Sequence, residues 1–402
     1  MLTANGHLSY CSNIHAGESW KDHFEALKVN FPKIKNAISP NQAMGIGLRL
    51  SNIASLEIIQ DDNLMEFKTW LQQEKAYVFT MNGFPYGGFH HTRVKDQVHA
   101  PDWTTIDRVA YAKRLLDVLL QLLPSGMDGG ISTSPLTYRY WFNQSQEELL
   151  NARKTATLNI LEVVIHLAKI KNETSTVLHL DIEPEPDGLL ETGQEFIDWF
   201  ENDLLVEGIS VIAQTFNVSD MEAETIIKEH LRLCYDICHF AVGYESHQEV
   251  LTQLKSKGIL VGKIQISAAL KALVNSFADR NQLKEAFTGY NESTYLHQVV
   301  ARKNNGSFIR YPDLPEALND AENASVEEWR AHFHVPLFLE DLGILKTTQS
   351  DITELLNIHK QHPFTNHLEV ETYTWEVLPD ALKLPIHESI IRELDWVKNV
   401  LA

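Results

Sequence analysis

A carboxylate and an imidazole stand three residues apart, directly after a predicted buried strand. The apolar run 231–235 predicts the strand, and Asp236 and His239 follow its end. Two such side chains leaving one strand can point into the same pocket, where oxygen and nitrogen donors suit a divalent metal. Alternatively, Asp236 caps the following helix and His239 is a buried histidine with satisfied hydrogen bonds. The pair alone leaves both interpretations open.

Strand-like and helix-like segments alternate along all 402 residues. Eight strands are predicted, at residues 8–13, 44–50, 77–82, 129–134, 177–183, 231–236, 260–267 and 367–371. Eight strands with helical crossovers favour an α/β fold of the (β/α)8 TIM-barrel type over a doubly wound open sheet. An open sheet would need a glycine-rich phosphate loop after the first strand, and residues 12–15 do not provide one.

The domain organisation follows from what separates these strands. No stretch of low complexity or of Pro, Gly and Ser marks a boundary, so we expect a single barrel domain over residues 1–402. The segment 268–365, between the seventh and eighth strands, is predicted to be a long insertion. It would form a lid over the site or an oligomer contact, and the sequence does not decide between these roles.

A barrel of this type carries its active site at the carboxyl ends of its strands. Glu183, Asp236, Gln265 and Glu371 fall at or near the ends of the last four predicted strands. Oxygen donors on four neighbouring strands predict one shared cation, which would be Mn²⁺, Mg²⁺, Co²⁺ or Zn²⁺. Each residue taken singly has the alternative of a helix cap or a salt bridge at the barrel mouth.

Composition restricts the partners and the compartment. The formal net charge of −20 opposes binding to a phosphate backbone, which needs clustered Lys and Arg, so we expect a small-molecule metabolite and no nucleic acid. The three cysteines form no disulfide framework. No signal peptide and no apolar run of about 18 residues is present, which predicts a cytoplasmic protein without a membrane span. An oligomer is compatible with the sequence.

Two short motifs resemble the xylose isomerase-like TIM barrels. Residues 236–244 resemble the D-x-C-H-x-x-x-G-Y signature of that superfamily, which includes the zinc AP endonucleases. Residues 263–267 resemble the strand of hydroxypyruvate isomerases in which a glutamine is a metal ligand, here Gln265. Glu183 and Glu371 fall where sugar epimerases of this superfamily keep two metal-bound glutamates. The resemblance implies that these two glutamates also shuttle the proton.

A closer resemblance extends over nearly the whole chain. Residues 8–20, 82–87, 182–186 and 332–336 resemble the EboE-type metabolite traffic proteins, and the similarity runs from the first strand to Trp375. It implies the same fold and superfamily site. It also implies a role in a bacterial ebo gene cluster that exports or processes a secondary metabolite. It implies no known reaction.

Further residues around the predicted barrel mouth are candidate substrate contacts: His15, Asn82, His90, His91, Lys95, Glu185, Arg330, His332 and His334. Alternate residues of an extended segment face one side, so Arg330, His332 and His334 could line one wall. In the endonuclease branch, histidines near positions 90 and 91 bind extra zinc ions. Superfamily members carry an Arg or a D-x-H pair in this connection, and here position 330 is Arg, which weakens the trinuclear zinc interpretation. A packed His15, an exposed Lys95 and a salt-bridged Glu185 are the structural alternatives.

Three functions are compatible with these residues. The first is a metal-dependent isomerase or epimerase in which Glu183 and Glu371 act as base and acid and His239 polarises the substrate oxygen. The second is a phosphoesterase of the endonuclease type with more than one metal ion, acting on a small phosphorylated metabolite. The third is a binding or traffic protein that kept the barrel without turnover.

Overall fold

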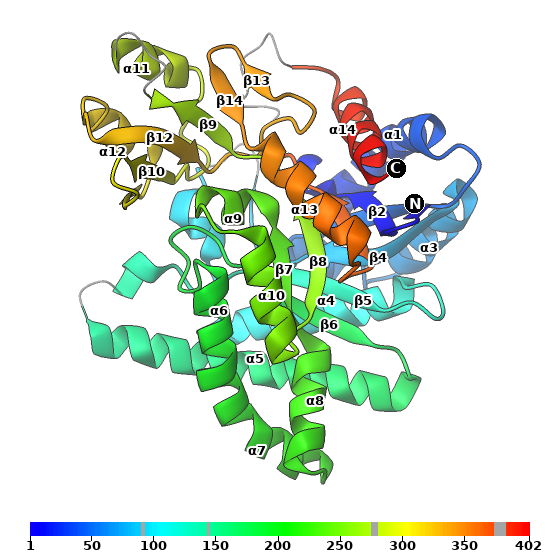
Figure 1. Ribbon diagram of the computed structural model, residues 1–402. Coiled ribbons are helices and arrows are strands. Elements are labelled where there is room, and N and C mark those ends of the chain that lie inside the picture. The colour runs from blue at the N-terminus through cyan, green and yellow to red at the C-terminus, as the bar shows by residue number, and fades with distance from the viewer. Residues whose placement is uncertain (90–92, 143–144, 275–279, 374–382) are drawn as a thin grey trace.

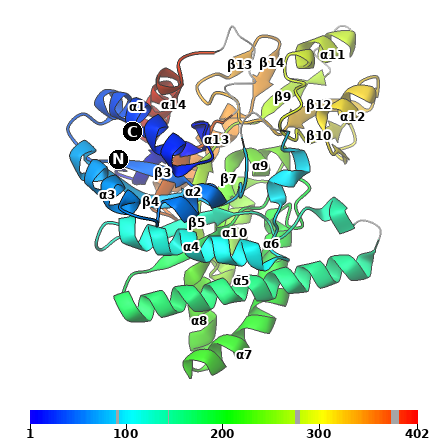
Figure 2. The same cartoon turned by 180° about the vertical axis from the view of Figure 1, so that it is seen from behind.

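The computed structural model describes residues 1–89, 93–142, 145–274, 280–373 and 383–402. Two β-sheets organise the chain: a barrel sheet surrounded by helices, and a smaller sheet at one end of it (Figure 1). Figure 2 shows the long helices α4 and α5 crossing the other side of the barrel.

The larger sheet is a (β/α)8 barrel. Its strand order is β1-β2-β15-β8-β7-β6-β5-β4-β3, and all pairings are parallel except that of β1 with β2. A parallel bridge between Cys11 and Gly47 joins β2 to β3 and closes the barrel. The strands are β1 (Leu2–Thr3), β2 (Gly6–Tyr10), β3 (Met44–Arg49), β4 (Ala76–Asn82), β5 (Gly129–Thr133), β6 (Leu178–Ile182), β7 (Leu231–Asp236), β8 (Val261–Ile266) and β15 (His367–Val370). The predicted fold class is confirmed.

Helices connect successive barrel strands and cover their outer faces. They are α1 (Trp20–Ile38), α2 (Asn52–Glu57), α3 (Asn63–Glu74), α4 (Ile106–Leu122), α5 (Gln146–Thr174), α6 (Gly193–Trp199), α7 (Leu205–Phe216), α8 (Asp220–His230), α9 (Ile237–Val242), α10 (His247–Lys257), α13 (Gln349–Gln361) and α14 (Ile386–Leu401). Short helical turns lie at Ser12–Ile14, Lys95–His99 and Arg139–Phe142, and a π-helical turn, Phe200–Leu204, joins α6 to α7. In the part of the chain that is described, no helix combines the length and apolarity needed to cross a bilayer.

The segment between β8 and β15 forms the second sheet, which is antiparallel. Its order is β11-β10-β12-β9-β14-β13. The elements are β9 (Leu270–Leu273), α11 (Arg280–Thr288), β10 (Val299–Lys303), β11 (Phe308–Tyr311), α12 (Leu314–Asn319), β12 (Val326–Ala331), β13 (Asp341–Leu342) and β14 (Leu345–Thr347). The last part of the predicted insertion is α13, which packs against α10 and α14 and so belongs to the ring of barrel helices.

The barrel interior is polar, whereas the apolar core lies between strands and helices. Leu8, Leu233 and Leu368 on the strands are fully buried in that core. Inside the barrel, Lys263 Nζ lies 2.8 Å from Glu369 Oε1, and neither side chain is exposed. Because successive strand residues face opposite sides, each strand can supply both environments.

Candidate metal centre

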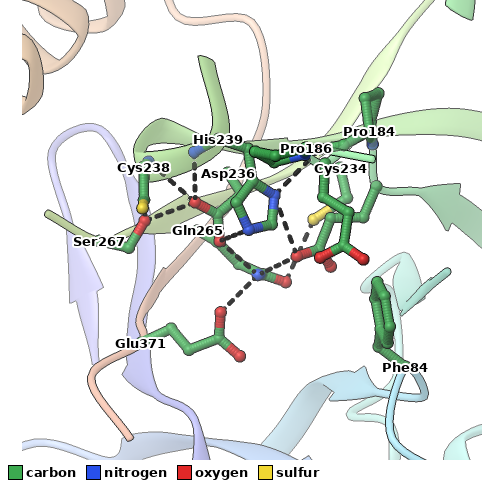
Figure 3. Close-up of polar contacts among 12 residues, drawn as sticks. Phe84, Pro184, Pro186, Cys234, Asp236, Cys238, His239, Gln265, Ser267 and Glu371 are labelled. Atoms are coloured by element: carbon green, nitrogen blue, oxygen red, sulfur yellow. Dashed lines mark hydrogen bonds and ion pairs between the residues drawn. The ribbon is translucent and has the colours of Figure 1, made fainter. Parts of the chain in front are cut away.

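Three carboxylates converge on one amide at the carboxyl end of the barrel. Gln265 Nε2 donates to Glu183 Oε1 at 2.9 Å, to Asp236 Oδ2 at 2.9 Å and to Glu371 Oε2 at 2.6 Å (Figure 3). All four side chains are buried. An amide group carries only two hydrogens, so it cannot satisfy three acceptors fully. The structure thus brings these four residues together, as predicted from the strand ends. The three carboxylates share the hydrogens of one neutral amide and have no positive charge between them.

Asp236 caps α9 with one carboxylate oxygen and turns the other toward the cluster. Its Oδ1 accepts from the backbone N–H of Cys238 at 2.9 Å and of His239 at 3.4 Å, which caps α9. Ser267 Oγ also donates to Oδ1, at 2.5 Å. The cap fixes the carboxyl group so that Oδ2 faces the other carboxylates. The local fold after β7 thus positions a ligand oxygen.

Three histidines around this cluster are held through their Nδ1 atoms. His239 Nδ1 lies 3.0 Å from the carbonyl of Pro184, His334 Nδ1 lies 3.0 Å from the carbonyl of Glu371, and His332 Nδ1 lies 2.8 Å from Gln298 Oε1. A carbonyl oxygen only accepts, so each ring places its proton on Nδ1. The neutral rings then turn unprotonated Nε2 atoms inward, which is the tautomer that binds metals.

The contact between two of these rings indicates a position for a proton or a cation. His239 Nε2 and His332 Nε2 are 3.1 Å apart. Two neutral rings protonated on Nδ1 have no hydrogen to place between these atoms, so the contact needs a proton or a cation. His334 Nε2 and His239 Nε2 each lie 3.9 Å from Asp236 Oδ2, on the other side. These residues fit a divalent ion.

The electrostatics of the cluster reflect the same deficit. Burial raises the pKa of both Glu183 and Glu371 well above the ordinary value, and neighbouring carboxylates raise it further. Burial also opposes ionisation of Asp236, but His239 and His334 hold its pKa below the ordinary value. Burial lowers the pKa of His334 to about 4, so this ring is neutral near pH 7. A bound cation would stabilise the ionised carboxylates directly.

Several residue groups at this mouth have metal-ligand geometry. Within the described residues, five groups of three potential ligands have ligand atoms within 4.8 Å of one another, and four of these groups lie here. They are Glu183/Asp236/Glu371, Asp236/His239/His334, Glu185/His239/His332 and Cys238/His332/His334. The structure therefore offers a carboxylate centre and an adjoining histidine-rich one.

A narrow cavity opens onto both centres. Its volume is about 60 Å³, and it is lined by Asn13, Asn82, Phe84, Pro85, Phe89, Lys95, Val98, His99, Glu183, Glu185, His239, Tyr295, Leu296, Gln298, His332, His334, Glu371 and Tyr373. This is room for about two water molecules. Acids, amides and imidazoles line it together with aromatic rings, which is a mixed surface suited to a small polar molecule.

Most of the predicted substrate contacts reach this cavity. Asn82 Nδ2 donates to Glu371 Oε1 at 2.7 Å. Glu185 Oε1 lies 2.7 Å from His99 Nε2, and Lys95 Nζ lies 2.6 Å from Asp313 Oδ2. The predicted His332 and His334 reach the cavity as well. His90 and His91 lie outside the described residues.

Two predicted contacts lie elsewhere. His15 is buried beside Tyr10, with its Nε2 3.1 Å from the Tyr10 hydroxyl, and it does not line the cavity. The expected common wall of three alternating residues lacks Arg330. Its guanidinium Nε lies 2.8 Å from Glu328 Oε1 and its Nη1 lies 3.2 Å from Asp351 Oδ1. These two carboxylates draw the side chain away from the mouth.

Other cavity residues had not been predicted as contacts. Asn13 Nδ2 donates to Glu371 Oε1 at 2.7 Å, so two amides hold that oxygen. The position of Asn13 at the end of the first predicted strand, 8–13, was the available signal. Gln298, which orients His332, and Tyr295 come from the segment before β10, where no pattern in the sequence indicated them.

The comparisons with known proteins concern the fold. No protein-family model and no curated protein matches the sequence. A xylose isomerase-like TIM barrel protein from Mycobacterium smegmatis in complex with magnesium is similar at 11% identity and a TM-score of 0.48, covering 100% of both chains. The IOLI protein with a zinc atom is similar at 13% identity and a TM-score of 0.46, over 98% of both chains. D-psicose 3-epimerase in the presence of D-fructose is similar at 10% identity and a TM-score of 0.48, over 98% of this chain and 99% of that one.

Proposed function

We propose that this protein is a divalent-metal-dependent isomerase or epimerase of a small polar metabolite that carries adjacent hydroxyl and carbonyl groups. The metabolite belongs to a secondary-metabolite processing or export pathway in the cytoplasm, as the resemblance to the EboE-type traffic proteins implies. The observation that carries the proposal is the convergence of Glu183, Asp236 and Glu371 on the single amide of Gln265.

The ligands of the ion would be Glu183, Asp236, Glu371 and Gln265. Gln265 would present Oε1 once its amide is turned, since the two amide positions differ only in assignment. When bound, the ion would polarise two neighbouring oxygens of the substrate and acidify the hydrogen on the carbon between them. The cation would be Mn²⁺, Mg²⁺, Co²⁺ or Zn²⁺.

Glu183 is placed to take the proton and Glu371 to return one. Glu183 Oε2 is buried and accepts no hydrogen bond among the described residues, so it is available as a base. Glu371 Oε1 is held by Asn13 and Asn82. Burial raises the pKa of both glutamates toward the range in which a carboxyl group exchanges protons near neutral pH. Two carboxylates on different strands allow transfer on opposite faces of one carbon.

The remaining cavity residues orient the substrate. His239 would polarise a substrate oxygen from Nε2 when a proton, rather than a cation, fills its contact with His332, because Nδ1 already donates to Pro184. Lys95, Glu185, His332 and His334 would contact the polar groups of the metabolite.

Solvent deuterium exchange tests this proposal. Metal-loaded protein in D₂O should incorporate deuterium at the carbon beside the carbonyl of a hydroxy-carbonyl substrate, found by screening a panel of sugars and hydroxy acids. Glu183→Gln should abolish the exchange, whereas Glu207→Gln on exposed α7 should not change it. Turnover without deuterium incorporation would contradict the mechanism. Metabolite binding without turnover or exchange would instead indicate a non-catalytic binding protein.

A metal-dependent phosphoesterase is the second candidate, because a histidine-rich centre adjoins the carboxylates. The contact between His239 and His332, with Glu185 beside it, offers a place for a further ion. Such an enzyme would release inorganic phosphate from a small phosphomonoester such as p-nitrophenyl phosphate. Loss of that activity together with one bound ion in His332→Asn would favour this candidate over the isomerase.

A further inference from the structure

A second group of potential ligands lies at the opposite, amino-terminal end of the barrel. It consists of Asp128, directly before β5, His179 at the start of β6, and His367 at the start of β15. Their ligand atoms lie within 4.8 Å of one another. No residue of the carboxyl-end centre is part of this group.

The two imidazoles are buried without hydrogen bonds on the atoms that face Asp128. His179 is 0% and His367 is 1% exposed. His179 Nε2 and both ring nitrogens of His367 make no hydrogen bond within the described residues. His179 Nε2 lies 3.8 Å from Asp128 Oδ2, and His367 Nε2 lies 3.4 Å from Asp128 Oδ1. Buried ring nitrogens usually have hydrogen-bond or metal partners, so these atoms are candidates for binding a ligand.

The tautomer of His179 fits a metal ligand. Its Nδ1 lies 2.6 Å from Asp181 Oδ1, and Asp181 is fully buried behind it. A carboxylate that accepts the Nδ1 proton leaves the Nε2 lone pair directed at Asp128, which is the usual arrangement behind zinc-bound histidines.

Two glycines make room for this arrangement. A Cβ on Gly130 would lie 2.1 Å from His179 Cε1, and a Cβ on Gly262 would lie 2.0 Å from Asp181 Oδ1. Contacts that short do not occur, so the ligand and its supporting carboxylate occupy space that only glycine leaves open. The positions of these side chains are therefore built into the strands.

We propose that Asp128, His179 and His367 bind a divalent cation of the zinc type, which links β5, β6 and β15 across the amino end of the barrel. Zinc–ligand bonds of about 2.0–2.1 Å in a tetrahedral site separate two ligand atoms by about 3.3 Å. His367 Nε2 lies 3.4 Å from Oδ1 of Asp128 and His179 Nε2 lies 3.8 Å from its Oδ2, and the three ligand atoms lie within 4.8 Å of one another, so small rotations of these side chains would bring them onto one ion. A water molecule supplies the fourth ligand from an adjoining cavity of about 790 Å³, which Asp128 lines.

Arg232 sets the strength of this site. Its Nη1 lies 3.2 Å from Asp128 Oδ2, so the guanidinium competes with the ion for the carboxylate. Arg232→Gln removes the competing charge and should tighten zinc binding. An increase in affinity is informative because a misfolded variant would lose affinity instead.

Zinc titration with elemental analysis tests the proposal. Asp128→Asn and His367→Gln should each reduce the zinc bound per chain by one ion. Asp181→Asn should lower the affinity for that ion by about 10- to 100-fold. His362→Gln changes an exposed histidine of the same cavity and should leave the stoichiometry unchanged. With Co²⁺, Asp128→Asn should remove the visible absorption of the amino-end ion and Glu183→Gln should leave that contribution in place, so the difference spectra of the two variants against the wild type separate the two sites.

The proposal is independent of the carboxyl-end chemistry. If Asp128→Asn and His367→Gln fold normally by circular dichroism and keep the full complement of zinc, the amino-end site does not exist. Equal affinity in wild type and Arg232→Gln would also overturn it. Loss of deuterium exchange in Glu183→Gln would bear only on the proposed function.

Discussion

At the carboxyl end of the barrel, Glu183, Asp236 and Glu371 share the two hydrogens of one amide, whereas at the amino end Asp128 is met by the guanidinium of Arg232. The carboxyl-end carboxylates have no positively charged partner in this contact, whereas Asp128 at the amino end has Arg232. Burial raises the pKa of Glu183, but the pKa of Asp128 lies below its ordinary value: burial opposes this lowering, and His367, His179 and Arg232 outweigh it. Such electrostatic strain costs stability and clusters at functional sites, so the comparison supports the carboxyl end as the proposed reactive end.

A buried ion pair separates the two ends. Lys263 and Glu369 lie on β8 and β15, between the carboxylate centre and the amino-end histidines. Burial disfavours the charge on Lys263, but Glu369 outweighs it and holds the pKa of Lys263 above its ordinary value. The pair lets Lys263 and Glu369 remain charged inside the barrel, between its two ends.

The largest effect should come from the reactive end. Glu183→Gln removes the base, and we expect the rate of deuterium exchange to fall by about 10²- to 10⁴-fold without loss of stability, because one of the crowded buried carboxylates is neutralised. Exchange rates and thermal melts of Glu183→Gln and Glu207→Gln, measured side by side, check this. An unchanged exchange rate in Glu183→Gln would remove the assigned difference between the two ends.

Breaking the pair between the ends should destabilise the whole barrel. Lys263→Met leaves Glu369 buried without its partner, which we expect to cost about 3–5 kcal/mol in the free energy of unfolding. The double variant Lys263→Met/Glu369→Gln should recover most of this loss, because no charge remains. Urea denaturation of both variants measures the difference, and equal stability of the single and double variants would refute a strong coupling.

The amino end should tolerate no added methyl group where glycine makes room. Gly130→Ala places a Cβ against His179, and we expect about 1–3 kcal/mol of destabilisation. Alanine in a strand is otherwise favoured over glycine by about 0.5–1 kcal/mol, so even the sign is informative. Gly87→Ala, where a Cβ meets nothing within 4 Å, is the matched control. A stabilised Gly130→Ala would show that His179 moves freely.

Per pH unit, the smallest effect should be the change in stability with pH that Glu393 causes near the carboxyl end of the barrel. Burial raises the pKa of Glu393 on α14 to about 8, although the backbone N–H of Leu337 donates to its carboxyl group. The folded state therefore holds this proton more tightly than the unfolded chain, whose glutamate pKa is about 4.3. The contribution to stability is complete below about pH 4.3 and is lost as the pH rises to about 8, by at most about 1.4 kcal/mol per pH unit.

Glu393→Gln should flatten this part of the stability profile. Urea denaturation of wild type and variant between pH 5 and pH 9, using about one point per pH unit, measures the slope. Parallel profiles for the two proteins would assign the pH dependence to other groups.

The sequence predicted the barrel because parallel strands are buried on both faces and read as apolar runs. The predicted strand 231–236 coincides with β7, Leu231–Asp236. The other predicted strands overlap those observed, so Glu183 and Glu371 could be placed beside Asp236 from strand ends alone. Geometry that depends only on the order of strands along the chain can be predicted in this way.

The small sheet and the barrel interior could not be predicted for physical reasons. The strands of the small sheet have two to six residues and pair mainly with distant partners, so local periodicity carries little signal. Lys263 and Glu369 look like surface residues in the sequence, because only the closed barrel brings them together. Arg330 was misplaced for the same reason, since Glu328 and Asp351 compete for it in three dimensions.

Two parts of the chain, the barrel strands and the segment after β12, supply the side chains at the carboxyl-end mouth. The barrel strands contribute the acids, and the chain leaving the small sheet contributes His332 and His334. An oxygen-seeking ion such as Mg²⁺ is served by the barrel alone, whereas a nitrogen-binding ion such as Zn²⁺ draws on the inserted segment as well. Exchange of residues 270–347 between relatives would thus change which metal ion the protein prefers without altering its eight barrel strands.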